Sequence, residues 1–237
     1  MNRESNVYTI IYSVVMVVIV ALGLAFTHQV LSDKQIANEN IDKMQQILRS
    51  LNIDASADEA QEAFSKLIQN AYLINDQGEK LDGTEGISPD DPAFSTELGD
   101  SSAEGMPVYE AEIDGATKYV IPMSGAGLWG SIWGYLAVEA EGSTIYGAEF
   151  DHAGETPGLG AEIADTPFKG QFKGKSLFRD GEFRSIAVVK PGRTVANRDY
   201  VDGISGGTIT SQGVDNMLLE SVGEYKSFLE NINAANR

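Results

Sequence analysis

The sequence predicts an α+β fold: a single N-terminal transmembrane helix, then a soluble domain with a mainly antiparallel sheet flanked by helices. Three observations support this prediction. An uncharged apolar run covers residues 7–27. Two pairs of β-rich runs follow, each divided by an acid–glycine turn, at residues 114–115 and 141–142. A last apolar run has helical spacing and follows the glycine-rich segment 202–210.

The apolar run at residues 7–27 is long enough for a membrane span. At about 1.5 Å per residue it extends roughly 30 Å as a helix, the thickness of a bilayer core. A cleaved signal peptide is the alternative, because residues 21–23 could serve as a cleavage site. Against it, the run exceeds the usual signal core, and Glu4 offsets Arg3 ahead of it. We therefore expect an uncleaved anchor after a short tail of residues 1–6.

Charge does not decide the orientation of this anchor. Arg3 precedes the apolar run, while Lys34 and Lys43 follow it. The positive-inside rule separates such small differences poorly, and large domains translocate largely regardless of charge.

Residues 28–75 are expected to form a membrane-proximal helical region. Apolar side chains between residues 36 and 51 approximate a helical stripe, and residues 56–59 read as a capping box that opens a second helix. The remaining chain, residues 76–237, is predicted to be the α+β domain. It begins with an acidic, loop-rich excursion over residues 76–107, in which the scattered carboxylates have the character of solvated surface.

The rest of the domain alternates strands and helices. Two hairpins are expected over residues 108–123 and 132–150, a short helix within 161–172, and a strand at 185–190. The last helix is expected to start beyond residue 208.

Composition excludes several classes of function. The net charge of -18 argues against a general nucleic-acid binder, which would have to attract phosphate backbones. The chain has no cysteine, so disulfides, iron–sulfur clusters and thiolate chemistry are excluded within it. With only His28 and His152, a histidine-rich metal site is not expected, and we predict no metal site.

A local basic stretch stands out in this acidic chain. Residues 166–198 contain eight Lys or Arg and two acids. The stretch is either a solvated face or a local positive field for an anion or a partner. Lys190 is the best functional candidate because it ends the predicted strand.

The segment 202–210 places hydroxyl groups at the start of the last helix. Free N–H groups and the macrodipole favour a phosphate at such a start, and glycines let the backbone approach a ligand closely. An ordinary Ser/Thr cap is the alternative. Local chemistry alone does not separate Thr208 from Thr210 as a modified hydroxyl.

Two motifs carry a resemblance to the FMN-binding family. The segment 202–208, Asp-Gly-Ile-Ser-Gly-Gly-Thr, resembles the acceptor motif of that family, in which a threonine carries FMN through a phosphoester. The segment 155–160, Glu-Thr-Pro-Gly-Leu-Gly, resembles its other signature. Gly207 departs from the alanine that relatives commonly have there. Over most of its length the chain is similar to the C subunits of Na+-translocating NADH:quinone oxidoreductases.

The resemblance implies covalent FMN on Thr208. A separate Mg2+-dependent flavin transferase would supply the catalysis with FAD as FMN donor, so no catalytic residue is expected in this chain. The transferase would recognise Asp202, Ser205 and Gly206. The residues expected to contact the cofactor are Trp129, Glu155, Thr156, Gly158, Leu159, Lys190, Ile204, Ser205, Gly206 and Gly207.

The function implied is that of an electron-carrying subunit of a bacterial inner-membrane complex. It would relay electrons from NADH toward quinone, with its soluble domain on the periplasmic side and sodium export in other subunits. One alternative is the homologous flavin subunit of the ferredoxin:NAD+ oxidoreductase complex. Another is a non-redox, membrane-anchored assembly or binding subunit.

Overall fold

The computed structural model describes residues 6–99 and 104–235. The chain divides into two compact units, Met1–Asp42 and Lys43–Arg237. Helix α1 (Asn6–Ser50) begins in the first unit and ends in the second. Its apolar first half is exposed, and by length and composition it could cross a membrane.

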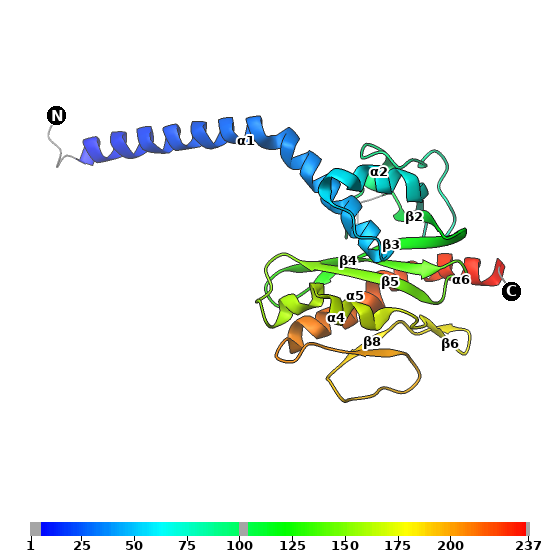
Figure 1. The fold of residues 1–237 in the computed structure, drawn as a ribbon. Coiled ribbons are helices and arrows are strands. Elements are labelled where there is room, and N and C mark those ends of the chain that lie inside the picture. The colour runs from blue at the N-terminus through cyan, green and yellow to red at the C-terminus, as the bar shows by residue number, and fades with distance from the viewer. Residues whose placement is uncertain (1–5, 100–103, 236–237) are drawn as a thin grey trace. The chain divides into compact units, whose positions relative to one another are not determined.

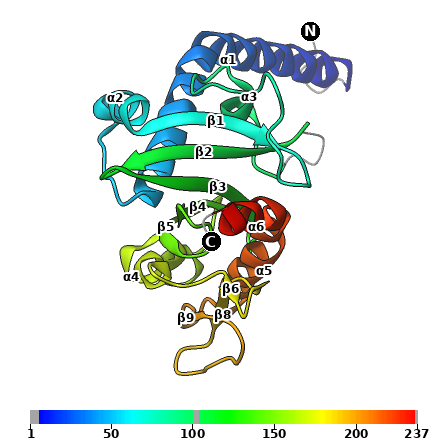
Figure 2. The ribbon, with the colours of Figure 1, turned by 90° about the vertical axis from the view of Figure 1, so that its right-hand side faces the viewer.

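The second unit is built on a five-stranded antiparallel meander (Figures 1 and 2). The strands follow chain order: β1 (Ile68–Ile74), β2 (Met106–Ile113), β3 (Ala116–Ala126), β4 (Ser131–Glu139) and β5 (Ile145–His152). Both predicted hairpins form, β2 with β3 and β4 with β5. The α+β fold class is confirmed.

Strand β1 is a difference from the sequence prediction, which places its residues in the helical region 28–75. Helix α2 (Ala57–Leu67) ends where the chain begins to pair with β2. The last four residues of β1 are all buried, so the strand has apolar side chains on both faces. Such a continuous apolar run has no period that separates a strand from a helix.

Alternate strand residues point into two layers of the core. On one face, Tyr109 lies edge-on to Phe64 of α2, which meets Phe94 of the short helix α3 (Pro92–Ser95) in the same way. On the other face, α5 (Thr208–Glu224) packs against β3. Figure 1 shows α2 on one side of the sheet and α5 on the other.

The capping box predicted at residues 56–59 is present. The Glu59 carboxylate accepts hydrogen bonds from the Ser56 hydroxyl at 2.7 Å and from the Ser56 N–H at 3.3 Å. Helix α3 gives the acidic excursion an ordered part, and the excursion ends where β2 begins at Met106.

Short elements follow β5. They are the 3-10 helix η1 (Gly160–Ala164), helix α4 (Thr166–Lys169), the 3-10 helix η2 (Gly170–Phe172), and the strands β6 (Phe178–Arg179), β7 (Glu182–Phe183), β8 (Ala187–Val189) and β9 (Tyr200–Asp202). The pair β8 and β9 is parallel, and the segment 203–207 connects β9 to α5.

The last helix begins at Thr208 itself and not beyond it. It is also interrupted: Tyr225 separates α5 from α6 (Lys226–Ala235). The Tyr225 side chain is buried, and its hydroxyl donates to the Pro107 carbonyl at 3.1 Å. This hydrogen bond holds the residue at which the helix is interrupted.

Candidate functional site

Thr208 lies where two cavities meet. It is the first residue of α5, and Gly207 is the N-cap residue, without a side-chain cap. Gly206 has a φ of 81°, a conformation that favours glycine, and forms the turn that brings the chain into the helix. The N–H groups of the first helical turn have no partner four residues earlier, so they favour an anion there.

The first cavity, of about 210 Å³, lies between the two sequence motifs. Its lining is Leu128, Glu155, Thr156, Leu159, Gly160, Gly206, Gly207, Thr208, Ile209 and Thr210. Leu128, Leu159 and Ile209 leave large parts of their side chains exposed there. Exposed apolar side chains gathered at a cavity are typical of a surface that binds a ligand or partner.

The second cavity, of about 590 Å³, lies on the other side of Thr208. Its lining is Val188, Val189, Lys190, Pro191, Arg193, Gly203, Ile204, Ser205, Gly206, Thr208, Ser211 and Gln212. Lys190 and Arg193 give this cavity two positive charges. A phosphate at Thr208 would therefore lie near the helix N–H groups and near the cavity side that carries Lys190 and Arg193.

Glu155 connects the loop 155–160 to two neighbouring segments. Its side chain is buried, and its two oxygens accept from the Trp129 N–H at 2.9 Å and from the Thr210 hydroxyl at 2.6 Å. Burial alone would raise the pKa of Glu155, but the hydrogen bonds from Thr210 and from the backbone of Trp129 and Leu128 hold it below its ordinary value. The Glu155 N–H in turn donates to His152 Nδ1 at 3.2 Å, which gives His152 a structural role.

The two threonines of the first turn differ in exposure. Thr208 is exposed, whereas Thr210 is 2% exposed and donates to Glu155. The structure therefore separates two hydroxyls that local sequence could not separate.

The structure brings most of the predicted site residues together. Thr156 and Leu159 line the first cavity, Lys190, Ile204 and Ser205 line the second, and Gly206 lines both. Three sequence-predicted residues line neither cavity: Trp129, Gly158 and Asp202.

These three residues lie at the periphery. Trp129 is 69% exposed at the β3–β4 turn, and only its backbone contacts Glu155. Gly158 has a φ of 76° in open space, so it shapes the turn. Asp202 ends β9 and accepts from the Gly192 N–H at 3.3 Å.

Sequence reasoning missed Leu128, Ile209 and Arg193 as cavity residues. Leu128 and Ile209 are adjacent in sequence to predicted residues, and that adjacency was the available signal. Arg193 lies in the basic stretch, where the sequence does not tell paired charges from unpaired ones.

Most charges of the basic stretch have partners. Lys169, Arg184 and Arg198 form ion pairs with Glu149, Glu182 and Asp215, while Lys173 and Lys175 lie over tyrosine rings. Within the described part of the chain, Lys190 and Arg193 form no ion pair, and both line the cavity beside Thr208. The solvated-face interpretation therefore fits only part of the stretch.

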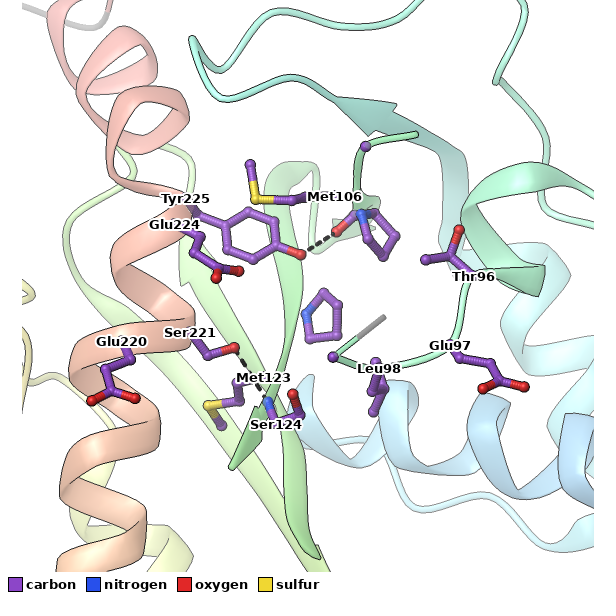
Figure 3. Close-up of a pocket in the computed structure, with 14 residues that line it drawn as sticks. Thr96, Glu97, Leu98, Met106, Met123, Ser124, Glu220, Ser221, Glu224 and Tyr225 are labelled. Atoms are coloured by element: carbon purple, nitrogen blue, oxygen red, sulfur yellow. Dashed lines mark hydrogen bonds between the residues drawn. The ribbon is translucent and has the colours of Figure 1, made fainter. Parts of the chain in front are cut away.

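A separate cavity of about 270 Å³ lies between α5, β3 and the segment that follows α3 (Figure 3). Figure 3 shows the Glu97, Glu220 and Glu224 side chains around it, together with the hydrogen bond in which Ser221 Oγ accepts from the Ser124 N–H at 3.2 Å. None of the predicted site residues lines it. Among the described residues, no three His, Cys, Asp or Glu side chains gather as a metal ion would require.

This chain is similar to known proteins in sequence and in structure. The model of the FMN-binding domain family matches residues 127–222, which include both cavities' loops and most of α5. The C subunit of the Na(+)-translocating NADH-quinone reductase of Vibrio vulnificus is 33% identical over 198 residues, 78% of each chain.

Two solved structures are similar to this fold. The crystal structure of the C subunit of the same reductase from Parabacteroides distasonis has a TM-score of 0.78 and 52% identity, and the match covers 84% of this chain and 96% of that one. That of Shewanella oneidensis NqrC has a TM-score of 0.66 and 27% identity, with 83% and 99% covered.

Proposed function

The chain belongs to the family of C subunits of the Na+-translocating NADH-quinone reductase, and from this premise we propose that it carries FMN as a phosphoester on Thr208. In this role it is an electron-carrying subunit that relays electrons from NADH toward quinone. Other subunits of the complex couple that transfer to sodium export. Helix α1 anchors the chain in the bacterial inner membrane, with the second unit on the periplasmic side.

One observation carries the assignment of the acceptor. Thr208 is the exposed hydroxyl at the start of α5, between an apolar cavity and a basic one, while Thr210 is buried and bonded to Glu155. In the attachment step the Thr208 Oγ–phosphorus bond forms and the bond between the two phosphates of FAD breaks. AMP leaves, and the hydroxyl proton passes to the medium. A separate flavin transferase, which recognises Asp202, Ser205 and Gly206, supplies the catalysis.

The residues present fit a phosphorylated, flat aromatic cofactor. In this proposal the α5 N–H groups, Ser205 and Lys190 hold the phosphate, and the support is that Ser205, Lys190 and Arg193 line the cavity beside Thr208. Leu128, Leu159 and Ile209 are exposed apolar side chains at the cavity, and they can pack against an aromatic ring bound there.

Glycines next to Thr208 let this segment pack closely against Leu159 and Ile204. A Cβ on Gly206 would lie 2.7 Å from Leu159 Cδ2, and one on Gly207 would lie 3.1 Å from the Ile204 side chain. Bound FMN supplies one- and two-electron transfer. The chain's part is to orient it and to set its environment through hydrogen bonds and burial.

The experiment uses the full chain, produced with and without a flavin transferase and run on a denaturing gel under ultraviolet light. Wild-type fluorescence that needs the transferase and is lost in Thr208→Ala supports the proposal. The matched control is Thr194→Ala, an exposed threonine in the loop between β8 and β9, which should stay fluorescent. A dark wild-type lane beside an active transferase would refute it, and fluorescence that persists in Thr208→Ala would move the attachment.

A further inference from the structure

The first turn of α5 presents two hydroxyl groups in different settings. A helix turns by about 100° per residue, so side chains two positions apart lie on nearly opposite sides. Thr208 lines both cavities, whereas the Thr210 hydroxyl points at Glu155 and is almost wholly covered. The chemistry of the two residues is identical, so their surroundings must make the difference between them.

Glu155 joins three separate segments of the chain. One carboxylate oxygen accepts from the turn between β3 and β4, at the Trp129 N–H, and the other accepts from α5, at the Thr210 hydroxyl. Glu155 itself opens the loop 155–160. At 5% exposure the carboxylate depends on these donors, since a buried charge without hydrogen bonds is costly.

Two glycines show that the backbone is shaped around this carboxylate. A Cβ on Gly127 would lie less than 3 Å from Glu155 Oε1, and a Cβ on Gly160 less than 3 Å from both Glu155 Oε2 and Thr210 Oγ1. Both glycines therefore leave room for the Glu155–Thr210 pair. The pair is almost wholly covered, and its hydrogen bond links the first turn of α5 to the loop 155–160.

We propose that Glu155 and Thr210 are positioning residues that select Thr208 as the acceptor. The inference rests on the proposed function. The Thr210 hydroxyl donates its hydrogen bond to Glu155. The same bond fixes the first turn so that Thr208 Oγ faces the border of the two cavities. FMN attachment at Thr208 then depends on the Thr210 hydroxyl, although Thr210 does not react.

The test measures the initial rate of flavin incorporation into the detergent-solubilised full chain, with purified flavin transferase and FAD. Thr210→Val removes the hydroxyl with little change of shape, whereas Thr210→Ser keeps the hydroxyl and removes only the methyl group. Ser221→Ala is the matched control: it removes a hydroxyl from the same helix that also bonds to another element, at β3, away from Thr208. Thermal unfolding and peptide mass mapping of the flavin accompany each variant.

We expect Thr210→Val to load about tenfold more slowly at saturating transferase, because a misplaced nucleophile lowers the rate of the bound state. Thr210→Ser should stay within about twofold of wild type, and Ser221→Ala should match wild type. Rescue by serine separates positioning from general stability. Glu155→Gln keeps the volume but has a single acceptor oxygen for two donors, so it should slow loading as well.

Three results would overturn the inference. Wild-type loading rates in Thr210→Val would do so, as would equal slowing by Ser221→Ala. If Thr210→Val does not fold, normal loading of folded Glu155→Gln decides against it in the same way. A wild-type chain that takes up no flavin overturns the proposed function and the positioning role together, while a loaded wild type with unaffected variants overturns the positioning role alone.

Discussion

Arg49, in the last turn of α1, donates from Nε to Glu149 Oε1 of β5 at 2.8 Å. The other oxygen of Glu149 accepts from Lys169 of α4 at 2.7 Å. One buried carboxylate thus ties the end of α1 and helix α4 to the strand that leads into the loop 155–160. Together with the hydrogen bond from Trp133 Nε1 of β4 to Gln46 Oε1 at 3.0 Å, this ion triad fastens the last turns of α1 to the sheet.

Glu149→Gln should destabilise the second unit by about 2 kcal/mol, because it leaves Arg49 and Lys169 without their shared charge. The loss should be less than that of a fully buried pair, since the two cationic side chains are 30% and 17% exposed. Urea unfolding of the solubilised chain measures it. Glu230→Gln, which removes the exposed pair with Lys226, is the control and should cost less than about 0.5 kcal/mol. Equal costs for both would contradict the role of the triad.

Gly160→Ala should lower both stability and flavin loading. The added methyl group meets Glu155 Oε2 and Thr210 Oγ1, so the loop or the first turn of α5 must move, at a cost of about 1–3 kcal/mol. Thermal unfolding and gel fluorescence together measure the two effects. Gly170→Ala adds the same methyl group in open space and should change neither. Unchanged loading in Gly160→Ala would show that the contact is dispensable.

Lys43 should make stability depend on pH. Burial lowers the pKa of Lys43 from 10.5 to about 8, against an opposing effect of Glu97, while its ammonium donates to the carbonyls of Phe94 and Thr96. Between these two values the folded state holds fewer protons than the unfolded state. The free energy of unfolding should therefore rise with pH above 8, by at most about 1.4 kcal/mol per pH unit.

Urea unfolding between pH 7 and 9.5, below the ordinary pKa of tyrosine, measures this dependence. Lys43→Met keeps an apolar stem without the titrating group, and its stability should be flatter over the same range. Parallel curves for the two proteins would mean that Lys43 does not titrate in this window.

Lys190→Gln should weaken the binding of free FMN to the Thr208→Ala chain. In that background no phosphoester forms at residue 208, so equilibrium titration of FMN fluorescence reports affinity alone. Loss of one exposed charge beside a phosphate corresponds to about fivefold weaker binding, and the effect should shrink as salt is added. Arg179→Gln removes the same charge from β6, outside both cavities, and should leave the affinity unchanged. Equal weakening by both changes would indicate only a general field.

Local sequence patterns were sufficient to predict much of this fold. The apolar run of α1, the hairpin turns at residues 114–115 and 141–142, and the capping box at Ser56 are local signals, and each has its own energetic cause. Strand β1 was missed because a strand buried on both faces lacks alternation.

The candidate site was foreseen only in part. The glycines and hydroxyls alone left an ordinary helix cap as an alternative, and the resemblance of the two motifs to the FMN-binding family implied a phosphate-linked cofactor on Thr208. Nothing in the sequence paired Glu155 with Thr210, because fifty-five positions separate them and their hydrogen bond forms only when α5 packs beneath the loop. The same holds for Arg49 and Glu149, one hundred positions apart.

The sequence by itself therefore determined most of the element types, which follow from backbone preferences and short-range spacing. It also contained the two motifs, whose family resemblance implied the candidate residues. Tertiary structure decided which threonine is exposed, which basic side chains of the described chain remain without an ion pair beside it, and which carboxylate is buried. Those properties depend on burial and on the distance between segments far apart in the chain. Both are set by packing and not by sequence order.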